Sequence, residues 1–149
     1  MALPKDWKEF IELLNANNVD FVVVGAFAVS HHAVPRNTGD IDFLIRPTRE
    51  NAERVIAAIE AFGFRSLSLK PEDFLAPDQF VQLGRQPNRI DIMTSISGVD
   101  NEEIWSSREE FVVDGHRMWT IGKAELIKNK IAVDRHKDRE DLKMLGVRG

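Results

Sequence analysis

Two aspartates separated by one residue, Asp40 and Asp42, are the side chains in this sequence whose types and spacing point most directly to chemistry. They stand at the start of an apolar run, residues 43–45, which is typical of a buried strand. Side chains alternate between the faces of a strand, so both carboxylates project from one face and Ile41 from the other. Two carboxylates held side by side repel each other unless a cation lies between them. The pair therefore predicts a metal site, and oxygen ligands near a phosphate suit Mg²⁺.

A glycine turn upstream of this pair can bring a phosphate to it. The apolar run Phe21–Val24 predicts a buried strand, Gly25 ends that strand, and a short helix is expected to begin at Ala26. Free backbone N–H groups at such a strand-to-helix turn form a binding site for phosphate. Gly25 alone indicates little, because glycine occurs in many turns. Together with the two carboxylates it outlines a site for metal-dependent phosphoryl or nucleotidyl transfer.

A third carboxylate, Asp91, lies within the predicted strand Arg89–Met93. Ile90 and Ile92 share one face of that strand, and Asp91 projects from the other. Acidic residues are common on solvent-exposed strand faces, so Asp91 by itself would mean little. Its β-branched neighbours and the earlier aspartate pair favour a metal ligand over a solvated side chain.

The order of these residues resembles the signature of the nucleotidyltransferase superfamily that includes polymerase β. Members carry a glycine turn, matched here by Gly25 and Ala26, before two aspartates separated by one residue. The resemblance implies that Asp40, Asp42 and Asp91 are catalytic and hold the metal, which is Mg²⁺ with Mn²⁺ as an alternative. It also implies that the Gly25 and Ala26 amides bind the nucleotide. Gly-Gly or Gly-Ser is usual at this turn, so Ala26 keeps the backbone donors and lacks the serine hydroxyl that would contact a phosphate.

Two segments are also similar to small bacterial proteins of the AbiEii type within that superfamily. The first is 35–42, which follows a histidine, and the second is the C-terminal segment 126–141. In the second segment, Lys130 matches a lysine implicated in activity, and Asp138 or Asp141 matches an aspartate. The resemblance assigns Lys130 to nucleotide binding rather than to the solvated surface, so Lys130→Ala is expected to weaken NTP binding and leave the melting temperature almost unchanged. It extends over residues 21–145 and is most specific between Gly25 and Asp42.

Four other polar residues, Arg36, Asp138, His31 and His32, have either two possible roles or no clear role in a site. Arg36 can bind a triphosphate oxygen through its planar guanidinium or pair with a nearby acid, and the two are equally expected. Asp138 suits catalysis or the N-cap of a last helix, and capping is slightly favoured. His31 and His32 are adjacent on the expected helix and so point apart, which argues against a shared metal ion. With four histidines and no cysteine, a zinc site is not expected.

Length and composition are typical of one globular domain spanning residues 1–149. The chain is 43% hydrophobic and 30% charged and contains no cysteine, as expected for a cytoplasmic protein. The N-terminus is charged where a signal peptide would be apolar, and no apolar stretch is long enough to span a membrane. A net charge of −4 argues against general nucleic-acid binding. Segment 123–143 has seven basic residues against five acidic ones, which fits either a solvated face or a local docking site.

The elements that must position these residues predict an α/β fold, a minimal nucleotidyltransferase core with a mixed β-sheet and helices mainly on one face. Helices are expected from Pro4 to about residue 15, from Thr48 to Gly63, over 102–110, from Gly122 to about 134, and from about 138 to 145. Further strands are expected over 80–83, 111–113 and 116–120, and less clearly over 64–69. Asp114-Gly115 favours a two-residue type I′ turn. The acidic loop 71–77 is expected at the rim of the site.

The function that the resemblance implies is transfer of a nucleoside monophosphate from an NTP to an acceptor hydroxyl, within a toxin–antitoxin-type system. The three aspartates would hold two Mg²⁺ ions about 3.5–4 Å apart. The expected acceptor is tRNA or a partner protein docked along segment 123–143. The alternative is a catalytically inactive nucleotidyltransferase-fold binding or antitoxin module, which Ala26 and the short chain favour. Retention of three aspartates counts against inactivity, because idle like charges reduce stability.

Overall fold

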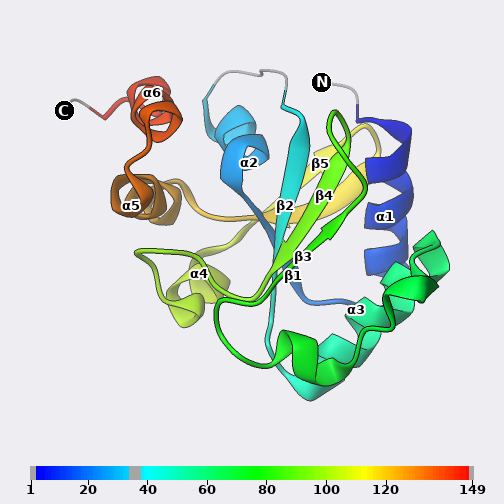
Figure 1. The fold of residues 1–149 in the computed structure, drawn as a ribbon. Coiled ribbons are helices and arrows are strands. Elements are labelled where there is room, and N and C mark those ends of the chain that lie inside the picture. Colours follow the sequence, from blue (N-terminus) through cyan, green and yellow to red (C-terminus); the bar gives the residue numbers. More distant parts are fainter. Residues whose placement is uncertain (1–2, 34–37, 148–149) are drawn as a thin grey trace.

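A six-stranded mixed β-sheet lies at the centre of the fold (Figure 1). The computed structural model describes residues 3–33 and 38–147. The strands are β1 (Phe21–Val24), β2 (Asp40–Ile45), β3 (Phe80–Leu83), β4 (Arg89–Met93), β5 (Glu109–Val113) and β6 (His116–Thr120). Their order is β3-β4-β2-β1-β6-β5. The pairs β2–β4 and β1–β6 are parallel and the other three pairs are antiparallel. The mixed sheet predicted from the sequence is confirmed.

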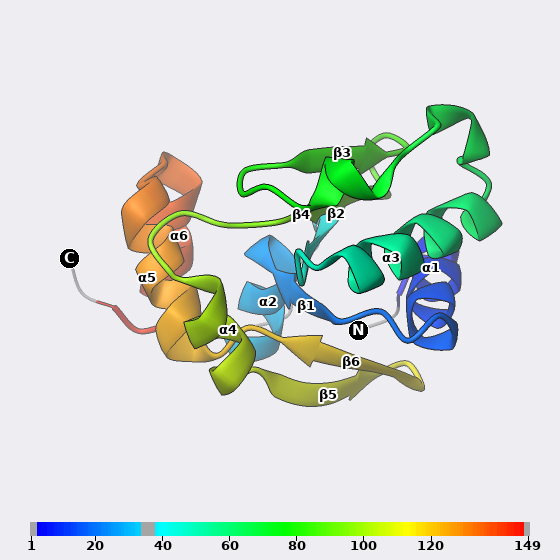
Figure 2. The ribbon, with the colours of Figure 1, turned by 90° about the horizontal axis from the view of Figure 1, so that it is seen from below.

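Helices cover both faces of this sheet, whereas the sequence pattern predicted coverage mainly on one. The helices of the described residues are α1 (Lys5–Ala16), α2 (Gly25–His32), α3 (Arg49–Phe62), α4 (Asn101–Ser107), α5 (Lys123–Val133) and α6 (His136–Met144). Helices α1 and α3 lie on one side of the sheet, and α2, α4, α5 and α6 lie on the other (Figures 1 and 2). None of these helices is both long and apolar enough to cross a membrane.

The two faces have separate hydrophobic cores because the central strand β1 is buried on both sides. Its four residues alternate, so Phe21 and Val23 pack with the helix α1 side chain Phe10 in one core. Val22 and Val24 pack in the other core, with Leu44 of β2. A continuous apolar strand of this kind needs cover on each face, which explains why helices lie on both.

Several element ends follow the local signals in the sequence. The Thr48 side chain accepts a hydrogen bond from the Asn51 backbone N–H at 3.2 Å, so it is the N-cap of α3. Gly63 ends the same helix in the left-handed conformation, with φ +115°. Asp114 and Gly115 both have positive φ, 52° and 79°, which fits the predicted type I′ turn between β5 and β6.

Four predicted segments differ in the structure. The helix predicted over 102–110 ends at Ser107, and Glu109 and Glu110 belong to β5. Residues 64–69 contain a 3₁₀ turn, Arg65–Leu67, and no strand. Within 71–77, a second 3₁₀ turn, Pro71–Phe74, packs against α3 and buries Phe74 in the core. This loop is therefore part of the scaffold and does not line the cleft at the aspartates. The last helix begins at His136, two residues before the expected start.

Candidate active site

Asp40, Asp42 and Asp91 converge at one place on the sheet. In the parallel pairing of β2 with β4, Asp42 lies opposite Asp91, and Asp40 is on the same face of β2 two residues earlier. One carboxylate oxygen from each aspartate lies within 4.8 Å of the other two. Asp91 is buried, and the other two are half-buried. Three carboxylates at this spacing are a suitable ligand set for Mg²⁺, which binds oxygen donors in compact arrangements.

The glycine turn lies directly against this cluster. Strand β1 runs antiparallel to β2 with Val24 opposite Asp42, so the next residue, Gly25, meets the Asp42 carboxylate. Gly25 has φ +72°, and a Cβ at this position would lie 2.0 Å from Asp42 Oδ2. Helix α2 begins here without a side-chain hydrogen bond at its N-cap, Val24. The first N–H groups of α2, including that of Ala26, are therefore suited to bind a phosphate beside the aspartates.

We expect Gly25→Ala to destabilise the protein for two separable reasons. A left-handed backbone conformation costs about 1–2 kcal/mol for a residue with a Cβ. The contact with Asp42 adds about 1–3 kcal/mol of overpacking. Gly84→Ala is the matched control, because Gly84 has φ +77° and nothing within 4 Å of an added Cβ. Thermal or urea unfolding of both variants should show the larger loss for Gly25→Ala, and equal losses would mean that Asp42 moves away without penalty.

Arg89, which the sequence did not single out, bridges two of the three aspartates. Its Nη2 donates to Asp40 Oδ2 at 2.8 Å, and its Nε donates to Asp91 Oδ1 at 2.9 Å. The hydrogen bonds that Arg89 donates to Asp91, together with the charges of both aspartates, raise the pKa of Arg89 against a smaller effect of burial. Arg89 thus neutralises part of the negative charge of the cluster. Its position two residues before Asp91, on the same strand face, was the signal available in the sequence.

The pKa of Asp42 is far above its usual value. Burial raises its pKa to about 8, and the negative charge of Asp40 and the hydrogen bond and charge of Asp91 act in the same direction. The positive charge of Lys130 opposes this shift. Near neutral pH, the Asp42 carboxyl therefore keeps its proton until a metal ion binds. Binding displaces the proton, because a metal ligand must be deprotonated.

Lys130 is buried, whereas the sequence predicted a nucleotide-binding side chain whose removal would leave the melting temperature almost unchanged. Only 4% of it is exposed, and its Nζ lies 3.1 Å from both Asp138 Oδ1 and Asp141 Oδ2. Both aspartates are buried as well. The helical spacing of α5 gave no sign of this, since the partners come from α6. Lys130 is thus part of a buried ion network that joins the last two helices.

Asp138 accepts hydrogen bonds in this network and does not serve as the N-cap of α6. Arg135 is the N-cap, and its backbone N–H donates to Asp138 Oδ2 at 3.0 Å. The Arg135 guanidinium also donates to Asp138, with Nε to Oδ2 at 2.7 Å. Burial raises the pKa of Asp138, but hydrogen bonds from Arg135 and Lys130 outweigh it and hold that pKa well below its usual range. Asp138 therefore stays ionised and fixes Lys130 and Arg135.

A cleft of about 360 Å³ joins these groups. Its walls include Gly25, the three aspartates and Arg89 on the sheet side. On the helical side they include the basic residues Lys130, Arg135 and Lys137. Arg36, the remaining predicted nucleotide-binding residue, lies outside the described residues. Carboxylates for a cation, amides for a phosphate and basic side chains for further phosphate charge thus face one cavity.

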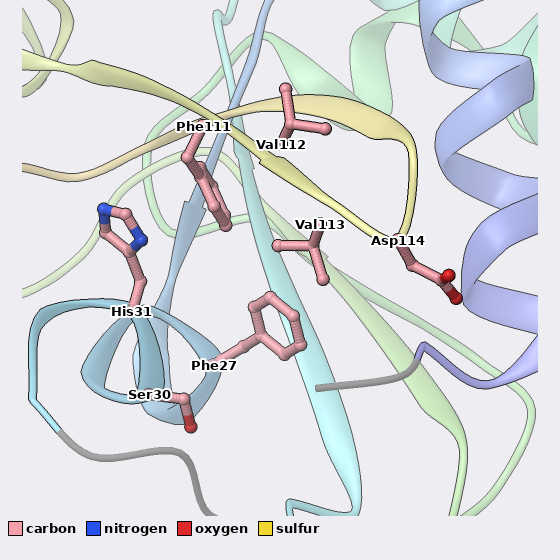
Figure 3. Close-up of a pocket in the computed structure, with 7 residues that line it drawn as sticks. All are labelled: Phe27, Ser30, His31, Phe111, Val112, Val113 and Asp114. Atoms are coloured by element: carbon pink, nitrogen blue, oxygen red, sulfur yellow. The ribbon is translucent and has the colours of Figure 1, made fainter.

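A second cavity, of about 300 Å³, lies between α2 and β5 (Figure 3). Phe27, Phe111 and Val113 supply most of its apolar lining, and Asp114 lies at one end. The Asp114 carboxylate is engaged by the Lys8 ammonium at 2.7 Å. The residues that line this cavity include neither a carboxylate cluster nor a glycine.

No protein-family model matches the sequence, and no curated protein is significantly similar to it. Solved structures are similar in fold. A Thermotoga maritima protein assigned as a nucleotidyltransferase has a TM-score of 0.63 and 15% identity, with 92% of this chain and 88% of that chain covered.

Two antibiotic-modifying enzymes give comparable matches. The lincosamide antibiotic adenylyltransferase LnuA, solved with lincomycin, has a TM-score of 0.61 and 14% identity over 97% of each chain. ANT(2″)-Ia, solved with adenylyl-2″-tobramycin, has a TM-score of 0.59 and 14% identity, covering 92% of this chain and 83% of that one. At such low identity these matches show the fold, which is that of nucleotidyltransferases.

Proposed function

We propose that this protein is a metal-dependent nucleotidyltransferase that moves a nucleoside monophosphate from an NTP to an acceptor hydroxyl. The observation that carries the proposal is the convergence of Asp40, Asp42 and Asp91 beside the N-terminus of α2. The adenylyltransferase activity named for LnuA is consistent with this chemistry in the same fold. Mg²⁺ is the proposed ion, with Mn²⁺ as the alternative, since the site offers oxygen ligands only.

Each part of the cleft has a role in this reaction. Bound metal would neutralise phosphate charge and activate the acceptor oxygen. The Gly25 and Ala26 amides, with Arg36 or Lys130, would bind the triphosphate. In this proposal Asp91 would receive the proton of the acceptor hydroxyl. As that oxygen bonds to the α-phosphorus, the bond to pyrophosphate breaks, and positioning with charge neutralisation supplies most of the rate enhancement.

The acceptor is best sought first among small hydroxyl compounds. Five of the seven basic residues in segment 123–143 form ion pairs, namely Lys128, Lys130, Arg135, Arg139 and Lys143. That pairing reduces the positive charge available for nucleic-acid phosphates. LnuA and ANT(2″)-Ia were solved with an antibiotic or its adenylyl adduct. The acceptor predicted from the sequence was tRNA or a protein, and both are tested second.

The alternative function, a catalytically inactive binding or antitoxin module, has one structural observation in its favour besides the sequence features named above. Arg89 already neutralises Asp40 and Asp91, so the carboxylate cluster can persist without a metal. The AbiEii type, a toxin–antitoxin context, a partner protein and a cytoplasmic location rest on the sequence alone.

The decisive experiment incubates the purified protein with Mg²⁺ and each α-labelled NTP in turn. Three acceptor pools are offered: lincosamides with aminoglycosides, total tRNA, and cell protein. The nucleotide label should appear in one of the three acceptor pools. It should not appear in the two controls, which are wild type with EDTA and the Asp42→Asn variant. Binding to tRNA, if it occurs, should weaken steeply with salt. Mg²⁺-dependent NTP binding without transfer to any pool would favour the inactive module, and absence of NTP binding would refute the proposed function.

A further inference from the structure

Three metal-ligating side chains meet at the opposite end of α2 from the aspartates. His31 and His32 are the last two residues of α2, and Glu109 is the first residue of β5. One ligand atom from each lies within 4.8 Å of the other two. The seven residues from Gly25 to His31 span about 9–10 Å of helix at 1.5 Å per residue, so this group is separate from the aspartate cluster.

The two histidine rings approach each other, contrary to the sequence-based expectation that they point apart. Their centroids are 4.7 Å apart, with the rings at 70°. Both residues lie at the C-terminal end of α2, and the next residue, Ala33, already has a non-helical backbone with φ −129° and ψ −112°. The His31 ring also packs on Phe111 of β5, with 4.4 Å between centroids (Figure 3). Phe111 and Glu109 share a face of β5, which brings the carboxylate to the same side.

A second, independent observation concerns the orientation of His32. Its Nε2 lies 2.6 Å from the backbone carbonyl oxygen of Ile121. A carbonyl oxygen only accepts hydrogen bonds, so Nε2 carries the proton and Nδ1 of the neutral ring keeps its lone pair. Metal-binding histidines usually donate the other ring N–H to a backbone carbonyl or carboxylate in this way, which fixes the tautomer. His32 is thus held in the form that a metal ligand needs.

We propose that His31, His32 and Glu109 form a second metal site, for a divalent transition-metal ion such as Zn²⁺. Two imidazoles and a carboxylate suit Zn²⁺ and leave a fourth position for water. Imidazole ligands also distinguish this site from the oxygen-only Mg²⁺ site. Ligand atoms around Zn²⁺ lie about 2.0–2.2 Å from the ion, so Glu109 must move inward slightly, which its exposed position on β5 allows. Bound metal ties the end of α2 to the edge strand.

The test is Zn²⁺ titration of untagged, chelator-treated protein by calorimetry, with Co²⁺ absorption in the visible range as a second probe. Wild type should bind one Zn²⁺ that both His31→Ala and Glu109→Gln weaken by tenfold or more. Two controls should leave that site unchanged: His136→Ala, which removes an exposed histidine on α6, and Asp42→Asn, which disables the aspartate cluster. Circular dichroism checks that each variant is folded.

Three outcomes would overturn this site: no Zn²⁺ binding by wild type, binding that neither His31→Ala nor Glu109→Gln weakens, or binding that Asp42→Asn removes. If His31→Ala fails to fold, Glu109→Gln decides alone, because Glu109 is exposed and its amide keeps the shape of the side chain. NTP labelling is not part of the test, so the site stands or falls independently of the proposed transferase activity.

Discussion

Asp42→Asn is expected to raise the melting temperature of the metal-free protein while abolishing nucleotidyl transfer. Arg89 donates hydrogen bonds to Asp40 and Asp91, whereas burial and the charge of Asp40 disfavour the ionised form of Asp42. Near neutral pH the folded protein holds this carboxyl protonated, whereas the unfolded chain ionises it, so a neutral amide of almost the same shape removes that cost of folding. The same amide is a poorer Mg²⁺ ligand than a carboxylate, so the function should be lost.

The raised pKa of Asp42 also predicts how the stability of the metal-free protein changes with pH. The pKa of Asp42 in the folded protein is raised to about 8, above its usual range near 4 in an unfolded chain. Between these values the folded state binds the extra proton, so the stability of wild type should fall as the pH rises from about 5 to 8. Asp42→Asn lacks this proton and should show a flatter profile. Urea unfolding in EDTA at several pH values measures both slopes.

With Mg²⁺ and NTP, wild type should have a higher melting temperature than Asp42→Asn, which reverses their order without ligand. At a hundred times the dissociation constant, ligand stabilises the folded wild type by about 2.7 kcal/mol. For a domain of this size, that corresponds to a rise of several degrees in melting temperature. The rise should be absent in Asp42→Asn and intact in Asp6→Asn, a control at an exposed aspartate of α1. If Asp42→Asn is less stable without metal and still gains the full shift, the carboxylates are structural.

The parts of the site that the sequence predicted depend on short-range rules. Alternation along a strand places Asp40 and Asp42 on one face, and the strand-to-helix turn requires a glycine at Gly25. Asp91 was identified by its apolar neighbours within a single strand. Each inference uses a few consecutive residues, and the parallel pairing of β2 with β4 then brings the pieces together.

The parts that the sequence missed depend on contacts between distant elements. Arg89 reaches Asp40 across 49 residues of chain. The helical spacing of α5 does not determine whether Lys130 faces solvent or the protein interior. The packing of α6 against α5 buries it. The convergence of His31 and His32 with Glu109 likewise requires β5 to lie beside α2. Helical periodicity carries no information about such partners.

Lys130→Met is expected to be the most destabilising single change considered, which corrects the sequence-based expectation of an almost unchanged melting temperature. The substitution removes the cation shared by Asp138 and Asp141, at 3.1 Å from each, and leaves two carboxylates in a buried position. Breaking a buried ion pair by removing one partner costs about 3–5 kcal/mol. Because Lys130 also lowers the pKa of Asp42, its loss further disfavours the ionised aspartate cluster. Urea unfolding measures the loss.

Two companion variants separate the ion network from the general effect of losing a lysine. Lys137→Met removes an exposed lysine that lines the same cleft and should change the free energy of unfolding by less than about 0.5 kcal/mol. Adding Asp141→Asn to Lys130→Met removes one of the two carboxylates that lose Lys130 as a partner, so the double variant should lose less than the sum of the single losses. If Lys130→Met instead unfolds like wild type and only its NTP affinity falls, Lys130 binds nucleotide as the sequence predicted, and the buried ion network does not stabilise the fold.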